Sequence, residues 1–193
     1  MSDSRPSALR GKSSPRPYVA LLRGINVGGK NKLPMKDLCA MFTSAGCTDV
    51  RNYIQSGNIV FQAERALAAK LPALITRAIA ERCGLQVPVV LRSAEEMRAI
   101  PVQNPVLGSG ERPEELAVCF LADLPDPARV AALDPHRSPP DAFVVHGREI
   151  YLRCPNGFAG TKLTTGYFDS KLATISTFRN WRTVLTLIEM LDG

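Results

Sequence analysis

The order of apolar segments over residues 17–92 is the feature that most constrains how this chain folds. Residues 18–22 (YVALL) are continuously apolar, which is typical of a strand inside a sheet. Residues 35–45 carry apolar side chains at helical spacing, between a proline suited to a helix start, Pro34, and a glycine suited to a helix end, Gly46. A strand followed by a helix is therefore expected first.

A hairpin, a second helix and an edge strand are expected next. Residues 50–56 and 59–61 predict two strands around an SGN turn, and apolar residues over 67–83 predict a helix. The run 87–91 contains Pro88, which suits an edge strand. The order strand, helix, strand, strand, helix, strand is that of a ferredoxin-like (βαββαβ) subdomain, with an antiparallel sheet and helices on one face.

The second half of the chain is expected to repeat this order in a degenerate form. The sequence SAEE at 93–96 is a capping-box pattern that predicts a helix start. The expected elements are a helix at 94–100, a Pro/Gly-rich connection at 101–114, a strand at 116–121, a short helix from Asp126 to about 133, a hairpin of 142–145 and 149–154, a long loop at 155–177 and a closing helix. No residue period matches between the halves, so the repeat is one of architecture.

We therefore predict an α+β protein with two subdomains. The ferredoxin-like subdomain covers 17–93, and a second, related α+β subdomain with a closing C-terminal helix covers 94–193. Residues 1–16 are rich in Ser, Pro and Arg and poor in large apolar groups, so they cannot offset the entropy cost of ordering. They are predicted to form a disordered basic tail.

Charge and hydropathy narrow the function classes. The 193 residues carry a net charge of +6. Residues 1–36 hold eight Lys and Arg against one Asp, whereas residues 37–193 hold 16 against 17, so the excess is local. No stretch reaches the ~18 consecutive apolar residues of a membrane span, and the start lacks the pattern of a signal peptide. We expect a cytoplasmic protein with no membrane partner; oligomeric state has no signature in the sequence.

The cysteines and histidines exclude several chemistries. The five cysteines are widely spaced, mostly within apolar runs, and contain no C-x-x-C pair. We expect buried thiols rather than disulfides or a zinc site, and no metal or cofactor. His136 and His146 lie in no local Cys-His or Ser-His arrangement, so no catalytic residue is identified.

The segment 24–31 (GINVGGKN) is the most informative motif. It matches the phosphate-loop pattern G-x-x-x-x-G-K-[ST] except at Asn31, and it lies between a strand and a helix. Asn31 cannot replace the hydroxyl that binds magnesium, and two hairpins imply antiparallel sheets, so a nucleotide hydrolase is disfavoured. Glycine amides with Lys30 could still hold a phosphate group without hydrolysis. The alternative is a tight crossover with solvated lysines.

A second candidate is the segment 176–183 (STFRNWRT). If Ser176 or Thr177 caps the closing helix, Arg179 and Arg182 fall near its N-terminus, where cations are unfavourable unless an anion binds. In the alternative, Trp181 is core and the arginines pair with carboxylates of the other half.

Two further segments carry weaker signals. The run 52–58 (NYIQSGN) could place Tyr53 on a sheet for base stacking, but only 6% of the chain is aromatic and hairpin residues are the simpler interpretation. The loop 157–166 (GFAGTKLTTG) could close over a site or be only a loop.

Three long motifs together resemble one bacterial protein family. YVALLRGINVGGKNKLPMKDL, YIQSGNIVF and TFRNWRTV resemble, in order and spacing, the family known as domain of unknown function 1697, from about Pro17 to Leu191. The resemblance implies an α+β protein of two subdomains in a bacterial cytosol, with no established activity or site residue. This chain has Phe178 where the family pattern has a Thr, and Arg182 where it has an Asn.

Three hypotheses of function remain. The first is a binding module in which the glycine-rich segment and the start of the closing helix meet between the halves and hold a phosphate-containing small molecule or a nucleic-acid backbone. The second is an enzyme on a phosphorylated small molecule or nucleotide that uses Asp169, His146 or Glu149, and the third is a non-catalytic protein-interaction domain. The predicted ligand-binding residues are Arg23, Gly24, Asn26, Gly28, Gly29, Lys30, Lys32, Arg179, Asn180 and Arg182.

Overall fold

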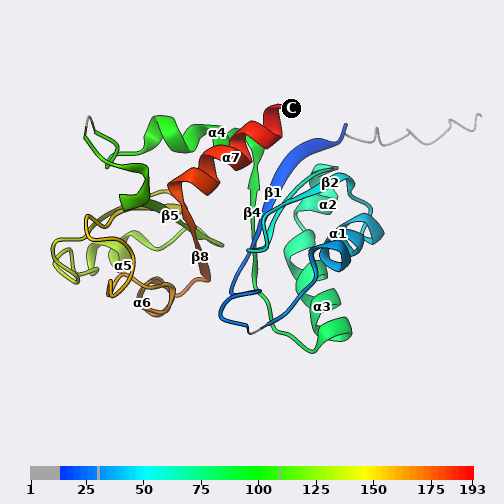
Figure 1. Cartoon of the computed structure of the whole chain (residues 1–193), viewed down its shortest axis with the longest axis horizontal. Coiled ribbons are helices and arrows are strands. Elements are labelled where there is room, and N and C mark those ends of the chain that lie inside the picture. The colour runs from blue at the N-terminus through cyan, green and yellow to red at the C-terminus, as the bar shows by residue number, and fades with distance from the viewer. Residues whose placement is uncertain (1–13, 30, 109) are drawn as a thin grey trace, which may run out of the picture.

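Two four-stranded antiparallel sheets form the protein (Figure 1). The computed structural model describes residues 14–29, 31–108 and 110–193. The first sheet has the order β2-β3-β1-β4 and the second the order β6-β7-β5-β8. The strands are β1 (Arg16–Leu22), β2 (Thr48–Tyr53), β3 (Asn58–Ala63), β4 (Val89–Ser93), β5 (Leu116–Leu121), β6 (Ala142–His146), β7 (Glu149–Arg153) and β8 (Ser176–Asn180).

Helices connect and cover the strands. They are α1 (Met35–Ser44), α2 (Arg65–Ala68), α3 (Leu71–Cys83), α4 (Ala94–Gln103), the 3-10 turn η1 (Pro113–Glu115), α5 (Pro127–Ala131), α6 (Thr165–Leu172) and α7 (Trp181–Asp192). The α+β class with two subdomains is confirmed. We call β1 to α4 the first half and β5 to α7 the second half; the predicted subdomain boundaries stay predictions, and residues 1–13 of the predicted tail lie outside the described residues.

The predicted edge strand and the predicted capping box at residues 93–96 are present. β4 is the last strand of its sheet, and Pro88 immediately precedes it. The Ser93 hydroxyl accepts from the Glu96 N–H while the Glu96 carboxylate accepts from the Ser93 N–H, which is the capping box of α4. Gly84 adopts the left-handed conformation, with a φ of 66°, at the end of α3.

One prediction about the second half was wrong. The segment 155–177, expected to be a loop, contains α6 and the start of β8, and the closing helix begins at Trp181 rather than near residue 176. α6 has only eight residues, and β8 has the polar sequence STFRN, so neither shows a strong periodic pattern. Ser176, Thr177 and Arg179 of this strand are nevertheless buried, and polar groups of the first half meet Arg179, as described below.

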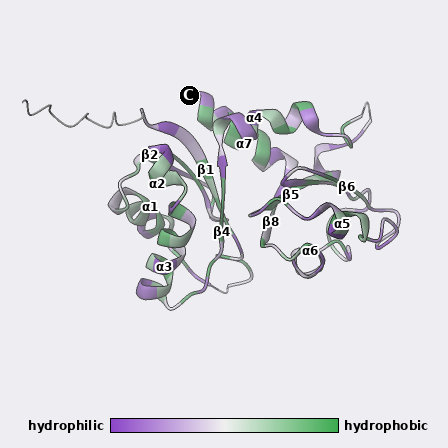
Figure 2. Cartoon of the chain, turned by 180° about the vertical axis from the view of Figure 1, so that it is seen from behind, coloured by the Kyte–Doolittle hydropathy of each residue, from purple (hydrophilic) through white to green (hydrophobic). Residues whose placement is uncertain are grey.

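Three hydrophobic clusters hold these layers together. One joins the first sheet to α1 and α3, and another joins the second sheet to α6. The third lies between the halves, where Val19, Val118 and Trp181 pack with the facing sides of both sheets, α4 and α7. α4 and α7 lie side by side (Figure 1), and their ribbons alternate between hydrophobic and hydrophilic colours (Figure 2), as expected for helices with one buried face.

The two halves correspond position by position through their strand register. Val19 of β1 lies opposite Arg92 of β4, and Val118 of β5 lies opposite Arg179 of β8. One step along, Tyr18 faces Ser93, whereas Ala117 faces Asn180. Ser93 and Asn180 both cap the helix that follows them. The repeat therefore extends to individual residues, which the comparison of residue periods did not reveal.

Candidate functional site

The glycine-rich segment forms a closed loop, residues 23–33, which we call the glycine loop. The Asn26 amide donates to the carbonyls of Leu33 (2.9 Å) and Gln55 (2.8 Å), and its Oδ1 accepts from the Leu33 N–H (2.9 Å). The Asn31 amide donates to the Gly24 carbonyl at 2.9 Å. Two asparagines thus hold the base of the loop, and Asn31 has a structural role at the position where a phosphate loop has its hydroxyl.

The tip of the glycine loop is open to solvent. Gly28 and Gly29 are exposed, with φ of 57° and 75°, and no atom lies within 4 Å of the place where a Cβ would stand. Lys32 is also exposed, whereas Lys30 lies outside the described residues. The asparagines also have positive φ, 55° at Asn26 and 50° at Asn31, a left-handed conformation that asparagine adopts more readily than most residues other than glycine.

Arg23 connects the glycine loop to the second half. Its guanidinium forms an ion pair with the Asp169 carboxylate of α6. The other Asp169 oxygen accepts from the Ser176 hydroxyl at 2.6 Å, and Ser176 begins β8. Because its charge is balanced by the Asp169 carboxylate, Arg23 links the first half to the second half.

Arg179 lies in β8, not in the first turn of the closing helix as predicted. Its side chain is buried between the halves, and burial without a facing carboxylate lowers the pKa of Arg179 to about 10. All its donors meet protein oxygens: Nε donates to Asn58 Oδ1, Nη1 to Thr177 Oγ1 (2.9 Å) and the Phe178 carbonyl (2.6 Å), and Nη2 to the carbonyls of Leu22 (2.7 Å), Gly57 (3.2 Å) and Ser56 (3.3 Å). The side chain joins the halves and has no donor left for a ligand.

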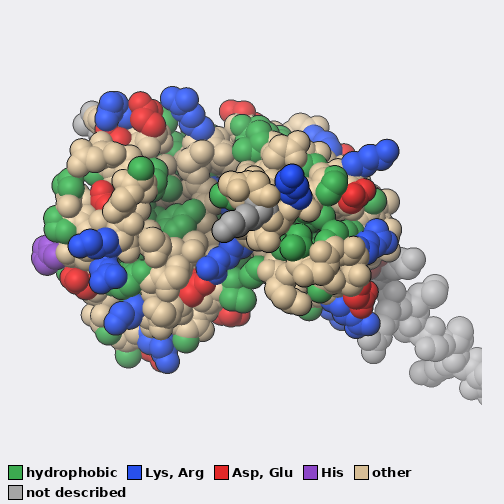
Figure 3. All heavy atoms as spheres, turned by 60° about the horizontal axis from the view of Figure 1, so that its bottom comes forward, with side chains coloured by type: hydrophobic (Ala, Val, Ile, Leu, Met, Phe, Trp, Pro, Cys, Tyr) green, Lys and Arg blue, Asp and Glu red, His purple; other side chains and the backbone are tan. Residues whose placement is uncertain are grey.

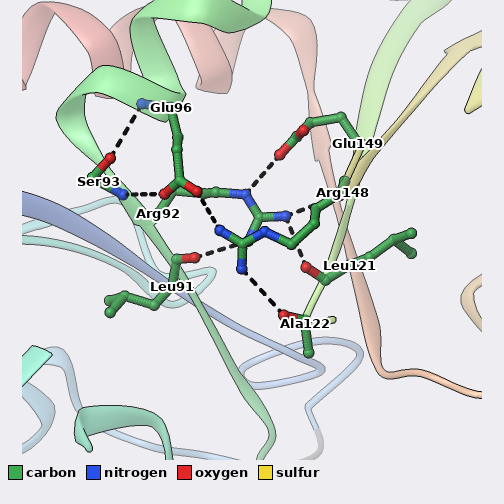
Figure 4. A network of polar contacts seen from close by, with 8 residues as sticks. All are labelled: Leu91, Arg92, Ser93, Glu96, Leu121, Ala122, Arg148 and Glu149. Carbon is green, nitrogen blue, oxygen red and sulfur yellow. Dashed lines mark hydrogen bonds and ion pairs between the residues drawn. The ribbon is translucent and has the colours of Figure 1, made fainter. Parts of the chain in front are cut away.

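Arg92 of β4 likewise joins the halves, but its side chain reaches from the first half to residues of the second half (Figure 4). Its Nε donates to Glu149 at 2.6 Å, and its Nη2 donates to the carbonyls of Leu121 (2.7 Å) and Arg148 (2.9 Å). Burial lowers the pKa of Arg92, opposed by the charge of Glu149. The two arginines therefore bind equivalent places in the opposite half. Each contacts the last residue of that half's first strand, a residue of its hairpin turn, and the first residue of the strand that follows the turn.

Sequence reasoning missed Arg92, although a signal was present. The segments LRSAEEM (91–97) and FRNWRTV (178–184) each place an Arg one residue before a helix-capping Ser or Asn. Aligned on the caps, these segments identify the arginine pair without a structure. The pattern covers too few identical residues to appear as a repeat period.

The predicted meeting of two segments occurs only in part. Arg179 contacts the end of β1 just before the glycine loop, so both segments meet where the halves join. Asn180 caps α7 by accepting from the Thr183 N–H at 2.8 Å, and Arg182 is exposed, 3.4 Å from Glu114. A cavity of about 330 Å³ lies between the halves, but it lies beside the Arg92 network, lined by β4, Ala122, Asp123 and Arg148.

The carboxylates proposed for catalysis are already engaged. Asp169 binds Arg23 and Ser176, and Glu149 binds Arg92. His146 is exposed at the end of β6. Within the described ranges, no three His, Cys, Asp or Glu side chains are grouped to hold a metal ion, and no helix is long and apolar enough to cross a membrane.

Comparisons with known proteins place the chain in a family. A family described as "Protein of unknown function (DUF1697)" matches residues 16–151. The solved structure of a conserved bacterial protein, SP0830 from Streptococcus pneumoniae, has 24% sequence identity and a TM-score of 0.72, over 93% of this chain and 100% of that one, and so shares the fold. No curated protein matched. The family match covers most of the chain, from β1 into β7. The chain therefore belongs to the DUF1697 family.

Proposed function

We propose that the protein binds a small phosphate-containing ligand, without catalysis, at the tip of the glycine loop. The observation that carries the proposal is a loop fixed at its base and open at its tip. The side chains of Asn26 and Asn31 hold the base of the loop through hydrogen bonds, with both residues in the left-handed conformation, while Gly28 and Gly29 are exposed. Such preorganised glycine backbones suit phosphate oxygens, because no Cβ blocks their approach.

The charge of the loop favours a small anion over a nucleic-acid strand. Lys30 and Lys32 are the two lysines of the loop, and Lys32 is exposed. On the face seen in Figure 3, basic side chains are scattered over both halves among acidic ones, without a continuous basic surface. A backbone-tracking nucleic-acid site normally needs such a surface. Catalysis is left out because Asp169 and Glu149 are ion-paired.

A thermal-shift comparison tests this proposal. Pyrophosphate, ATP, glucose 6-phosphate and a short oligonucleotide are tested on the protein and on a Lys30→Glu/Lys32→Glu variant. At a ligand concentration ten times its Kd, binding adds about 1.4 kcal/mol to the free energy of unfolding. Each kcal/mol raises the Tm of a chain of this size by roughly 2–4 °C. The variant should lose this rise.

The matched control carries the same charge change elsewhere. Lys70→Glu/Lys171→Glu alters two exposed lysines, one at the start of α3 and one in α6, and should keep the ligand-induced rise in Tm. A rise in no condition, or equal losses in both variants, contradicts the proposal. A rise confined to the oligonucleotide that falls steeply from 50 to 200 mM salt would indicate a nucleic-acid ligand instead.

A further inference from the structure

A second cavity lies wholly within the second half, away from the glycine loop. Its volume is about 520 Å³, within the usual range for small-molecule sites. β5 and β8 form one side, and the segment 158–165 that leads into α6 forms the other. The lining residues are Ala117, Phe158, Thr161, Leu163, Thr164, Thr165, Phe178 and Asn180.

The corresponding place in the first half also holds a cavity, of about 670 Å³, which is lined by Tyr18, Leu91 and Ser93 together with charged side chains such as Arg16, Arg65 and Glu95. Ala117 occupies the strand position that Tyr18 holds in the first half, since each faces the helix-capping residue of the neighbouring strand. Tyr18 fills its place with a ring that stacks on Phe61 at 5.9 Å. Ala117 has only a methyl group at this position, and the cavity beside it differs from the one beside Tyr18 in having no charged lining residue.

The chemistry of the lining is specific in charge and in hydrogen-bonding type. No charged side chain is among the lining residues. Phe158 and Phe178 present partly exposed carbon surfaces, which favour a planar ring. The Asn180 Oδ1 accepts from the Thr183 N–H, whereas the amide N–H groups of this exposed residue and the hydroxyl of the half-buried Thr165 have no protein partner among the described residues. The Asn180 amide offers two donors and the Thr165 hydroxyl can donate as well, so these groups match carbonyl acceptors.

We propose that this cavity binds a small uncharged molecule whose planar ring carries carbonyl groups. The ring lies against Phe158 and Phe178, and its carbonyls accept from Asn180 and Thr165. The loop that forms the cavity wall bends at Gly157 and Gly160, with φ of 80° and 87°. This site shares no residue with the glycine loop, so it stands or falls separately from the phosphate site.

Saturation-transfer NMR with uridine, an uncharged ring with two carbonyls, tests the proposal on the full chain. The wild type should transfer saturation to the uridine ring protons. Ala117→Tyr inserts the side chain of the equivalent first-half position and should weaken binding by about tenfold or more, roughly 1.4 kcal/mol. Lys30→Glu/Lys32→Glu should leave uridine binding unchanged.

A second variant removes the donors without filling the cavity. Asn180→Asp keeps a good helix cap, so Tm should hold, but it replaces the amide donors by a carboxylate and should abolish binding. Ser93→Asp, at the equivalent cap of α4, is the control and should bind uridine normally. No saturation transfer in the wild type, or transfer in Ala117→Tyr and Asn180→Asp as strong as in the wild type, overturns the proposal.

Discussion

At the scale of single residues, the defining feature is a buried arginine without a carboxylate. Arg179 donates to one amide oxygen, one hydroxyl and carbonyls on both sides of the junction. Burying a charge is costly unless its hydrogen bonds are complete, and these are complete. The residue therefore contributes through the oxygens it satisfies, and its loss would leave several of them buried and unpaired.

Replacing Arg179 should destabilise the protein strongly. Arg179→Met leaves the carbonyls of Leu22 and Gly57 and the Asn58 amide oxygen without their donor, and should lower the free energy of unfolding by about 3 kcal/mol or more. Urea unfolding measures the difference. Arg182→Met, at an exposed arginine, is the control and should stay within about 0.5 kcal/mol of the wild type. Equal stabilities of the two variants would refute this role.

The buried thiol of Cys119 should make stability fall in alkali. Burial raises the pKa of the Cys119 thiol from 9.0 to about 12. Between these values the thiol stays protonated in the folded state but ionises in the unfolded state, so the free energy of unfolding falls as pH rises above about 9. Relative to Cys119→Ala, the wild type should lose about 1.4 kcal/mol by pH 10 in urea titrations. A constant difference from pH 7 to 10 would contradict the assignment.

At the scale of elements, the glycine loop shows how a near-match to a motif can have another role. The phosphate-loop pattern fails at Asn31, and the structure uses that side chain to bind the Gly24 carbonyl. The helix after the glycine loop, α1, also differs from the helix that follows a phosphate loop, because it has Pro34 as its N-cap and an acidic residue, Asp37, in its first turn. Asp37 interacts favourably with the dipole at the start of α1, so a phosphate group at the loop tip would be bound by the glycine backbones and the lysines rather than by this helix start.

Placing the hydroxyl residue of the phosphate-loop pattern at position 31 should therefore destabilise the glycine loop. Asn31→Ser removes the hydrogen bond to the Gly24 carbonyl and places at a φ of 50° a residue that adopts positive φ less readily than asparagine. The free energy of unfolding should fall by about 1 kcal/mol, and Tm should fall with it. Magnesium should not enhance ATP binding in this variant. Asn31→Gly loses the bond but accepts the positive φ, and its Tm should lie between that of Asn31→Ser and the wild type. Magnesium-dependent ATP binding by Asn31→Ser would contradict the structural role.

At the scale of the whole molecule, each half completes the other. Arg92 binds the end of β5 and the β6–β7 turn, and Arg179 binds the end of β1 and the β2–β3 turn. The cluster around Trp181 takes residues from both sheets and both central helices. Separating the halves would expose this cluster and leave two arginine networks incomplete.

The halves should consequently unfold together. Trp181, the single tryptophan, lies in the shared cluster and reports on the junction, whereas far-ultraviolet circular dichroism reports on all elements. The two signals should give coincident urea transitions, as for a two-state protein. Fluorescence changing at lower urea than circular dichroism would show that the halves separate before they unfold.

The sequence alone determined the fold class, most elements and the capping box of α4. These follow from apolar periodicity and from residues such as Pro88 and Ser93, whose effects act on neighbours a few positions away. The same local reasoning missed α6 and β8, because β8 is stabilised by contacts of Arg179 with residues more than 120 positions earlier.

Tertiary structure decided which side chains are available to a ligand. Whether Arg179 meets an anion or the carbonyls of another strand depends on which elements lie beside it in space. The cavity beside Ala117 likewise differs from the corresponding cavity beside Tyr18, which charged side chains line, and this difference can be recognised only when the strands are superposed by register. Periodicity sets local structure, whereas the partners of a buried polar group are set by packing between distant segments.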